Sequence, residues 1–424
     1  RPFHKIMTGT LKPILGYLML AAGAGVIVSN LDPLGKMIEH GFHITGVVPN
    51  NEAIVAVAQK VLGVETMSIL VVGLLMNLLI ARFTKFKYVF LTGHHSLFMA
   101  CLMSAVLGTA GLSGIELILV GGFLMGAWSA ISPAIGQSYT SKVTDGDEIA
   151  LGHFGSLGYY LSAWVAKYVG KAEESTEDIE IPEKWGFLRD STLSTALTMI
   201  VFYLIAAIAA GSEFVATLSG SMSPYLFAVM SAMNFAVGVA IVYSGVRMIL
   251  GDLIPAFQGI ATKIIPNAIP AVDCAVFFTY APTAVVLGFI SSFIGGIIGM
   301  LILGAVGGVL IIPGLVPHFF CGATAGIYGN ATGGRRGAAV GAFLNGLAIT
   351  FLPALALPVL GQLGFQNTTL GDADFAVMGL VLGNAFEWIG MAGIYGVVVI
   401  AALVLIIPNF IKTKGKVINY VEEE

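Results

Sequence analysis

The stretch AVVLGFISSFIGGIIGMLILGAVGGVLII, residues 284–312, contains no charged side chain. A helix needs about 20 apolar residues to cross the hydrocarbon core of a bilayer, and this stretch is longer. Transmembrane β-barrels would instead show alternating segments of about ten residues. The sequence therefore predicts an all-α integral membrane protein with about ten transmembrane helices and additional broken or re-entrant half-helices. Further long apolar runs occupy 66–81, 96–111, 117–131, 195–210, 224–250 and 389–407.

The overall composition agrees with lipid as the main solvent. Hydrophobic residues make up 57% of the chain and charged residues only 10%, whereas soluble proteins have about 25% charged residues. A net charge of −4 argues against a nucleic-acid surface. Cys101, Cys274 and Cys321 lie in apolar stretches without C-x-x-C spacing, which favours buried small hydrophobes over disulfides or metal ligands.

No enzyme signature is present, because the chain has no P-loop, no G-x-S-x-G motif and no H-E-x-x-H motif. The sequence therefore predicts no catalytic residue, no cofactor and no metal site. The chain begins at Arg1 without a methionine or a signal-peptide pattern. We expect that some native N-terminal sequence precedes it.

Basic residues gather in four short segments, 82–87, 167–190, 335–336 and 412–416. Short basic loops are normally cytoplasmic, so we place all four segments inside. The segment 167–190, KYVGKAEESTEDIEIPEKWGFLRD, is the one sizeable polar loop. It is either a solvated linker between helices or a docking edge for a cytoplasmic partner.

Three short matches indicate two related halves. Residues 16–19 (GYLM) match 245–248 (GVRM), LTGH at 91–94 matches 314–318, and LGH at 151–153 matches LGN at 382–384. The spacings of these matches are similar, which is typical of an internal repeat. The predicted organisation is a first repeat (1–166), a cytoplasmic amphipathic loop (167–190), connecting transmembrane helices (191–243), a second repeat (244–411) and a cytoplasmic tail (412–424).

The 54 glycines and 16 prolines are many for uninterrupted helices. Membrane helices tolerate breaks where protein or a water-filled cavity satisfies the freed backbone groups. The densest breaks lie at 23–30, 266–282 and 312–317. Because a helix end held at mid-membrane presents unpaired N–H groups, these breaks indicate a site for an oxygen-rich ligand.

Four ionisable side chains, His94, His95, His153 and Asp273, interrupt apolar segments. Each costs about 2.5 to 3.5 kcal/mol on insertion scales. Neighbouring helical residues diverge by about 100°, so we expect only one of His94 and His95 to face a cavity and the other to bond a nearby carbonyl. A single membrane histidine is often just an interhelical hydrogen bond, but His94, His153 and Asp273 together favour a polar ligand pocket.

At LTGH (91–94), VTDGDEIALGH (143–153), GVRM (245–248) and KIIPNAIPAVDCAVFFTYAPTAVV (263–286), the sequence resembles the ascorbate-type enzyme IIC. This family is the membrane permease component of the bacterial phosphoenolpyruvate-dependent sugar phosphotransferase system. The similarity extends over nearly the whole chain.

The resemblance implies a multi-pass protein of the bacterial inner membrane, with two inverted repeats and an eleven-helix protomer whose first helix precedes Arg1. It also implies a homodimer in which a mobile core carries the substrate past a rigid scaffold, as an elevator. The permease would not be an enzyme by itself. A separate component IIB, charged through component IIA, would phosphorylate ascorbate at the cytoplasmic side.

The resemblance also implies site residues. His94, His153 and Asp273 match the family's polar contacts to ligand hydroxyls, and Gly23 matches a backbone contact. Ala24 stands where the ascorbate-binding members have serine.

Four further contact positions differ from the ascorbate-binding members. Those members have glutamine at the positions of Phe98 and Phe154, and threonine and tyrosine at those of Asn51 and Glu52. Ala21 also replaces a glutamine. The two phenylalanines offer flat apolar faces to a ring or to the C–H side of a sugar. Glu52, if it faces the pocket, would disfavour an anion.

The leading hypothesis is a phosphotransferase permease for a small polyhydroxylated substrate, ascorbate or an analogue, which works with components IIB and IIA among membrane lipids. The first alternative is an ion-coupled secondary transporter in which Asp273 and Glu52 are the coupling carboxylates. A third hypothesis is a receptor that binds ligand without moving it and holds a partner through residues 167–190.

Overall fold

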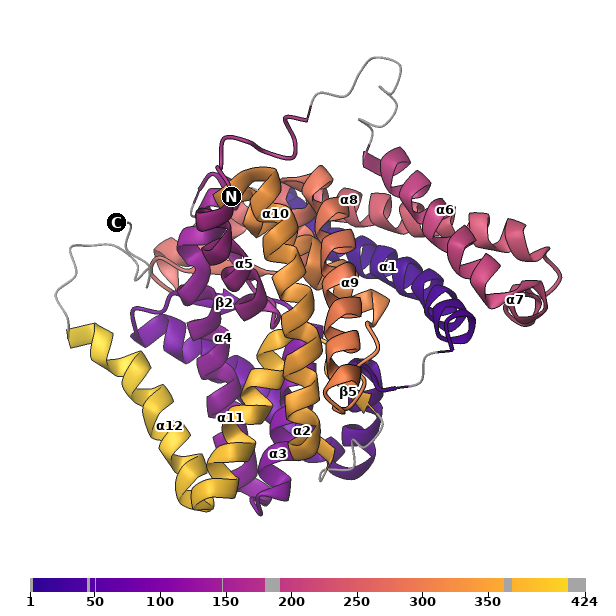
Figure 1. Cartoon of the computed structure of the whole chain (residues 1–424). Coiled ribbons are helices and arrows are strands. Elements are labelled where there is room, and N and C mark those ends of the chain that lie inside the picture. The colour runs from indigo at the N-terminus through magenta and orange to yellow at the C-terminus, as the bar shows by residue number, and fades with distance from the viewer. Residues whose placement is uncertain are drawn as a thin grey trace.

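The computed structural model describes residues 3–43, 46–49, 51–146, 148–179, 191–361 and 368–410 (Figure 1). Most of these residues are helical. The helices are α1 (Phe3–Gly41), α2 (Asn51–Phe83), α3 (Gly93–Thr109), α4 (Gly114–Thr144), α5 (Ser156–Val169), α6 (Ser191–Ala210), α7 (Ser212–Ser219), α8 (Pro224–Lys263), α9 (Pro282–Ala305), α10 (Leu315–Gly361), α11 (Ala373–Ile389) and α12 (Met391–Ile406). Short 3₁₀ helices, η2 and η3, occupy Cys274–Thr279 and Ile407–Phe410.

Within the described ranges, seven helices are long and apolar enough to cross a membrane, and the bent pair α6 and α7 makes an eighth if it counts as one span. The predicted helical membrane class is confirmed, but these spans are fewer than the ten expected. Sequence windows overcount because α3, α5 and α11 have only 14 to 17 residues, which is shorter than a full span.

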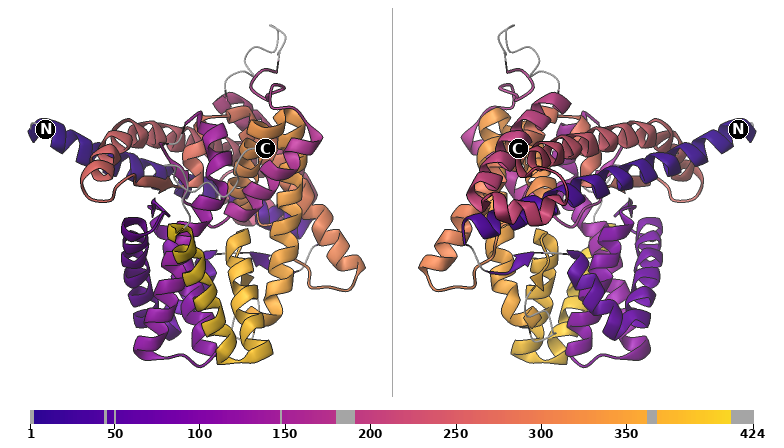
Figure 2. Two further views of the ribbon diagram at one scale, coloured as in Figure 1. Left: turned by 90° about the vertical axis from the view of Figure 1, so that its left-hand side faces the viewer. Right: turned by 90° about the vertical axis from the view of Figure 1, so that its right-hand side faces the viewer.

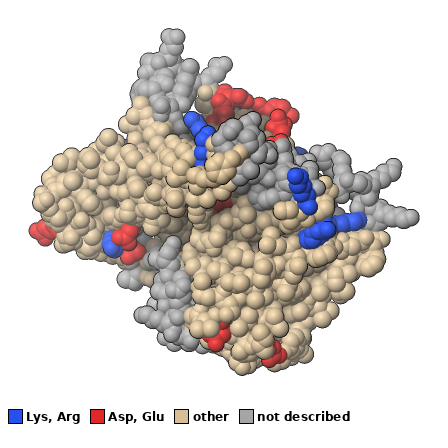
Figure 3. Space-filling view, turned by 180° about the vertical axis from the view of Figure 1, so that it is seen from behind, with Lys and Arg blue, Asp and Glu red and all other residues tan. Residues whose placement is uncertain are grey.

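The surface of the spans is apolar. On α12, Val399, Ile400 and Leu403 are each about half exposed or more. Helices that are apolar on all sides are stable at a surface only if that surface contacts lipid or another apolar partner. Figure 3 shows the same property over one whole face, where charged side chains form a few small patches on an otherwise uncharged surface.

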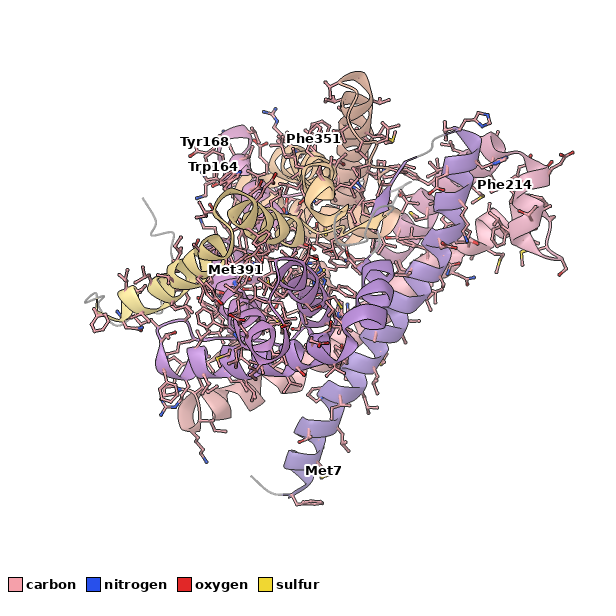
Figure 4. The ribbon with its side chains drawn as sticks, turned by 90° about the horizontal axis from the view of Figure 1, so that it is seen from below. Met7, Trp164, Tyr168, Phe214, Phe351 and Met391 are labelled. Atoms are coloured by element: carbon pink, nitrogen blue, oxygen red, sulfur yellow. The ribbon has the colours of Figure 1, made fainter. Side chains whose placement is uncertain are left out.

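Helices α1, α6, α7 and α8 form an arm that projects from the rest of the molecule (Figure 2). Helix α1 packs along α8 at a close crossing, where a Cβ atom on Gly23 would lie 2.8 Å from the carbonyl oxygen of Gly238. Small residues at a crossing let two membrane helices approach closely. In Figure 4, Met7 marks the free end of α1, and Phe214 of α7 lies near its other end, where the Phe214 ring stacks on His40.

Five short strands lie where the helices are interrupted: β1 (Val48–Pro49), β2 (Tyr88–Phe90), β3 (Ala150–Leu151), β4 (Ile269–Val272) and β5 (Thr368–Thr369). They form two parallel sets. In one set β4 lies between β2 and β3. In the other set, β1 pairs with β5. Val47, which directly precedes β1, pairs with Ile311. The pairing satisfies backbone groups that the interrupted helices leave open, as a membrane interior requires.

In each set, segments from the N-terminal part of the chain pair with segments from the C-terminal part. Strand β4 pairs with β2 and β3, while β1 pairs with β5 and the preceding residue, Val47, pairs with Ile311. The sequence Leu370-Gly371-Asp372 follows β5 directly. A similar sequence, Leu151-Gly152-His153, stands at the end of β3, where Leu151 is the last residue of the strand. The sequence match of 151–153 with 382–384 is therefore wrong in structural terms, because 382–384 lies inside α11.

The loop predicted from Lys167 begins later, since α5 continues to Val169. Residues 180–190 fall outside the described ranges. The preceding part is fixed on the helices. The Glu177 carboxylate accepts hydrogen bonds from the backbone N–H groups of Thr283 and Ala284 at the start of α9, and Asn330 Oδ1 accepts the Thr176 N–H at 2.9 Å. This described part is therefore a packed strap.

Candidate functional site

A cavity of about 510 Å³ lies between α1 and the ends of the short strands. Helix α1 contributes mostly small or apolar side chains, including Ala21, Ala24 and Val28, together with the hydroxyl side chains of Tyr17 and Ser29. The opposite wall carries most of the polar groups. They are Asn51, His94, His95, His153, Asp273 and Asp372.

The parallel strands explain why these polar groups meet. His94 and His95 begin α3 just after β2, His153 follows β3, and Asp273 follows β4. Because the three strands are neighbours and run in one direction, their carboxyl ends lie together. At this edge Gly152 donates its N–H to the carbonyl oxygen of Val272 at 2.7 Å.

His94 and Asp273 form the first polar pair. His94 Nε2 lies 3.3 Å from Asp273 Oδ2, and the histidine side chain is 44% exposed to the cavity or solvent. Asp273 is held in place because its Oδ1 atom also accepts the backbone N–H of Ala275 at 3.0 Å, which caps η2. The pair therefore presents one imidazole whose orientation is set by a fixed carboxylate.

His95 and His153 are buried, and their ring centroids lie 3.7 Å apart. His95 Nδ1 accepts the N–H of Phe154 at 3.3 Å, and His153 Nδ1 accepts the N–H of Gly155 at 3.1 Å. A backbone N–H can only donate, so each neutral ring carries its hydrogen on Nε2, a tautomer assigned from these partners. The hydroxyl of Tyr159 adds a second contact to His153 Nδ1 at 2.9 Å.

The expectation that only one of His94 and His95 reaches a cavity is wrong, since both line it. The expected carbonyl partner of His95 is wrong too. Its partner is an N–H group of the turn that leads into α5, because the first N–H groups of a helix and of the turn before it have no partner within that helix.

Asp372 is a site residue that the sequence reasoning missed. It is 4% exposed, and it accepts hydrogen bonds from Asn51 Nδ2 at 2.7 Å and from the Cys321 thiol at 2.9 Å. Asn51 Oδ1 in turn accepts the Gly371 N–H at 2.9 Å. The Oδ1 atom of Asp372 lies 3.9 Å from His153 Nδ1, too far for a hydrogen bond. The signal that would have found it is the repeat of Leu-Gly-His at 151–153 as Leu-Gly-Asp at 370–372.

Residues 1–374 match the protein family described as the PTS system sugar-specific permease component. The chain belongs to this permease family. The chain is also similar to the "Ascorbate-specific PTS system EIIC component" of Mycoplasma pneumoniae (strain ATCC 29342 / M129 / Subtype 1), with 24% identity over 443 aligned residues. The alignment covers 90% of this chain and 66% of that relative, so the chain spans slightly less than two thirds of the relative's length. The family predicted from the sequence is confirmed.

The permease cavity contains most of the predicted contact residues. Ala24, Phe98 and Asn51 line it together with His94, His153 and Asp273. The side chain of Glu52 falls outside the described residues.

Two predicted contacts lie elsewhere. Gly23 is on the face of α1 that packs against α8, because its lack of a side chain is used at that helix crossing. Phe154 is fully buried and stacks on Phe90 at 4.5 Å between ring centroids. Its backbone N–H donates a hydrogen bond to His95 Nδ1.

The cysteines of the permease are buried and free. Cys101 fits the predicted role of a small hydrophobe. Cys274 lines the cavity, and Cys321 donates to Asp372, so these two contribute polar contacts that the apolar sequence context does not indicate.

Two groups of side chains have ligand atoms close enough to hold a metal ion. His95, His153 and Asp372 form one group, and His153, Asp273 and Cys274 the other, with the ligand atoms of each group within 4.8 Å of one another. The Nδ1 atoms of both histidines already accept backbone N–H groups. A metal ion would have to displace one of those bonds or the Nε2 hydrogen, so the permease site suits hydroxyl groups better than a cation.

Proposed function

We propose that this chain is the membrane permease, component IIC, of a phosphotransferase system. It binds a small polyhydroxylated substrate of the ascorbate type, moves it across the bacterial inner membrane and presents it to component IIB for phosphorylation. The observation that carries this proposal is the cavity in which imidazole donors and carboxylate acceptors converge beside apolar faces. Family membership supports the same conclusion.

The two walls of the cavity support an elevator-like motion. The paired histidines and aspartates lie on elements joined by the short strands, whereas α1 of the arm contributes small and apolar groups such as Ala21 and Ala24. Apart from Tyr17 and Ser29, the α1 wall is apolar and carries no charged side chain, so the two walls can slide past each other without breaking ionic bonds. We assign the strand-joined elements to a mobile core and the arm to a scaffold, within two inverted repeats.

The arm also supports a homodimer. Side chains of α6 and α8 that project outward, including Val201, Ile205 and Val237, are more than half exposed. An apolar patch of this kind contacts either lipid or another protein. A second copy of the arm would cover this surface and hold the scaffold still while the core moves.

The chemistry of phosphorylation suits the pair of His94 and Asp273. His94 Nε2 lies 3.3 Å from Asp273 Oδ2, and an imidazole nitrogen that carries no hydrogen is a hydrogen-bond acceptor. A substrate hydroxyl that attacks the phosphoryl group of component IIB must lose its proton, and His94 can accept it as a general base. The chain itself then supplies binding, orientation and a proton acceptor.

The test is uptake in cells that contain this chain, with and without component IIB. We expect accumulation of the phosphorylated substrate only when IIB and phosphoenolpyruvate are present. Concentrative uptake of unmodified substrate without IIB would overturn the proposal, and its collapse with an ionophore would identify an ion-coupled transporter. Ligand binding without any transport in proteoliposomes would identify a receptor.

A further inference from the structure

We propose that Asp372 is a second carboxylate of the substrate site and that it makes the site selective for a neutral polyol over an anion. This inference rests on the proposed permease function and names the class of its substrate. It narrows the proposed polyhydroxylated substrate to neutral polyols and departs from the ascorbate-specific relative, because ascorbate is a monoanion at neutral pH.

The Asp372 carboxylate has unused capacity to accept hydrogen bonds. An ionised carboxylate has about four acceptor positions and no donor. Asp372 accepts two hydrogen bonds, one on each oxygen, from Asn51 and Cys321. It lines the cavity while only 4% exposed, so its remaining acceptor positions need a partner from within that cavity. A burial this deep without further partners is costly unless a ligand supplies them.

The charge balance of the cavity also favours a neutral ligand. Asp273 and Asp372 both line it, and none of the described residues around it is lysine or arginine. The two buried histidines are held as neutral Nε2–H donors by backbone N–H groups. An anionic substrate would meet two carboxylates, while the third imidazole, His94, is already paired with Asp273 at 3.3 Å. Like charges in a partly buried site repel strongly.

The imidazole and carboxylate groups of the cavity together suit a hydroxyl group. Each half of the chain ends a short strand with Leu-Gly followed by a polar residue, His153 in the first half and Asp372 in the second. A sugar hydroxyl both donates and accepts, so it can accept from an imidazole N–H and donate to a carboxylate at once. The pair of His94 and Asp273 offers the same combination. A carboxylate or enolate oxygen cannot donate, so an anionic ligand has fewer donor groups to offer the two carboxylates than the matching polyol.

A purely structural role for Asp372 predicts a different result. If the carboxylate only tied the β5–α11 turn to α2 through Asn51, its replacement would lower stability and weaken every ligand equally. Selectivity between neutral and anionic ligands is therefore the decisive measurement.

The variant Asp372→Asn separates these roles. Its side-chain oxygen can still accept from Asn51, while its NH₂ group replaces the oxygen that faces Cys321. Asn51 keeps its own orientation because its Oδ1 accepts the Gly371 N–H. Glu387→Gln is the matched control, since this exposed carboxylate lies on the same helix α11 and does not line the cavity.

The experiment measures ligand-induced thermal stabilisation of the purified full chain in detergent, which reports affinity through ln(1 + [L]/Kd). The probes are two neutral polyols, xylitol and glucitol, and two anions, gluconate and ascorbate. Glucitol and gluconate differ only at one terminal carbon. We expect the wild type to bind a polyol at least about tenfold more tightly than either anion, and Asp372→Asn to shrink that ratio about tenfold. Glu387→Gln keeps the ratio.

The inference would be overturned by a wild type that prefers ascorbate or gluconate, by a wild type that binds neither class, or by an Asp372→Asn variant that keeps the ratio while weakening all ligands. The wild-type comparison stays decisive even if the variant fails to fold. Polyol binding that requires Zn²⁺ and disappears with a chelator would also overturn it, in favour of a metal site. Dependence of uptake on component IIB is read separately, so a neutral-selective chain that needs no IIB would contradict only the permease function.

Discussion

The turn after β3 and the turn after β5 each follow a short parallel strand and contain a Leu-Gly sequence, yet one carries a neutral histidine and the other a carboxylate. His153 receives its hydrogen bonds from its own turn, through Gly155 and Tyr159. Asp372 receives its hydrogen bonds from distant elements, through Asn51 of α2 and Cys321 of α10. The same backbone device thus gives one locally fixed donor and one acceptor whose position depends on the packing of the whole core.

Asp374 joins these two turns, and its loss has the largest expected effect. The buried Asp374 carboxylate accepts from Ser156 Oγ at 2.7 Å, from the Leu157 N–H at 2.9 Å and from Trp128 Nε1 at 3.1 Å. Asp374→Ala leaves three donors unsatisfied, so we expect a loss of about 3 kcal/mol or more in the free energy of unfolding.

Thermal unfolding of the purified protein measures this effect. The control is Asp32→Ala, which removes an exposed carboxylate paired with Lys36 and should cost less than about 1 kcal/mol. Equal destabilisation by the two variants would show that the two turns are not joined through Asp374.

The glycines of the two turns distinguish their surroundings. A Cβ atom on Gly152 would lie 2.4 Å from the backbone oxygen of Ala271, while one on Gly371 would lie 2.4 Å from the ring of Pro317. A strand backbone paired on both sides cannot move aside, whereas a proline ring can repucker. We expect Gly152→Ala to cost about 3 kcal/mol and Gly371→Ala about 1 kcal/mol, measured as the difference in unfolding midpoint. The reverse order would mean that β4 is the looser neighbour.

The smallest effect concerns the side-chain donors. Tyr159→Phe removes one donor from His153, but the Gly155 N–H still fixes the tautomer. We expect a stability loss of about 1 kcal/mol and a change in ligand affinity below about threefold. The matched change on the other turn, Cys321→Ala, should reduce affinity more, because Asp372 then keeps only Asn51 as a donor. Calorimetric titration of the two variants with one ligand compares them, and a larger effect from Tyr159→Phe would contradict the comparison.

The sequence predicts the membrane class and half of the polar site for the same reason. Long apolar runs have few solutions in lipid, and a charge or imidazole inside such a run stands out. His94, His153 and Asp273 are therefore visible in the sequence, and the structure brings them to one cavity.

Asp372 and the number of spans could not be found in that way. Asp372 lies in the polar sequence GDADF, in which a carboxylate directly before a helix predicts an N-cap residue and not a ligand contact. Strands of two to four residues are too short to show a period of two, so their pairing, which places the site, has no local signal. Helices α3 and α11 have the apolar composition of full spans but only 17 residues each, and their ends are not marked in the sequence.

The interleaved strands also determine the order in which this chain can mature on the ribosome. Strands β2 and β3 are synthesised long before β4, which must enter between them. Until it does, the nascent first half carries an open slot of unpaired backbone and a set of buried-type histidines without their aspartate. Contacts between such distant segments form slowly, and open strand edges invite wrong partners meanwhile. Insertion of the helices into the membrane is therefore only the beginning of assembly, because the site is complete only when β4 has paired with both of its neighbours.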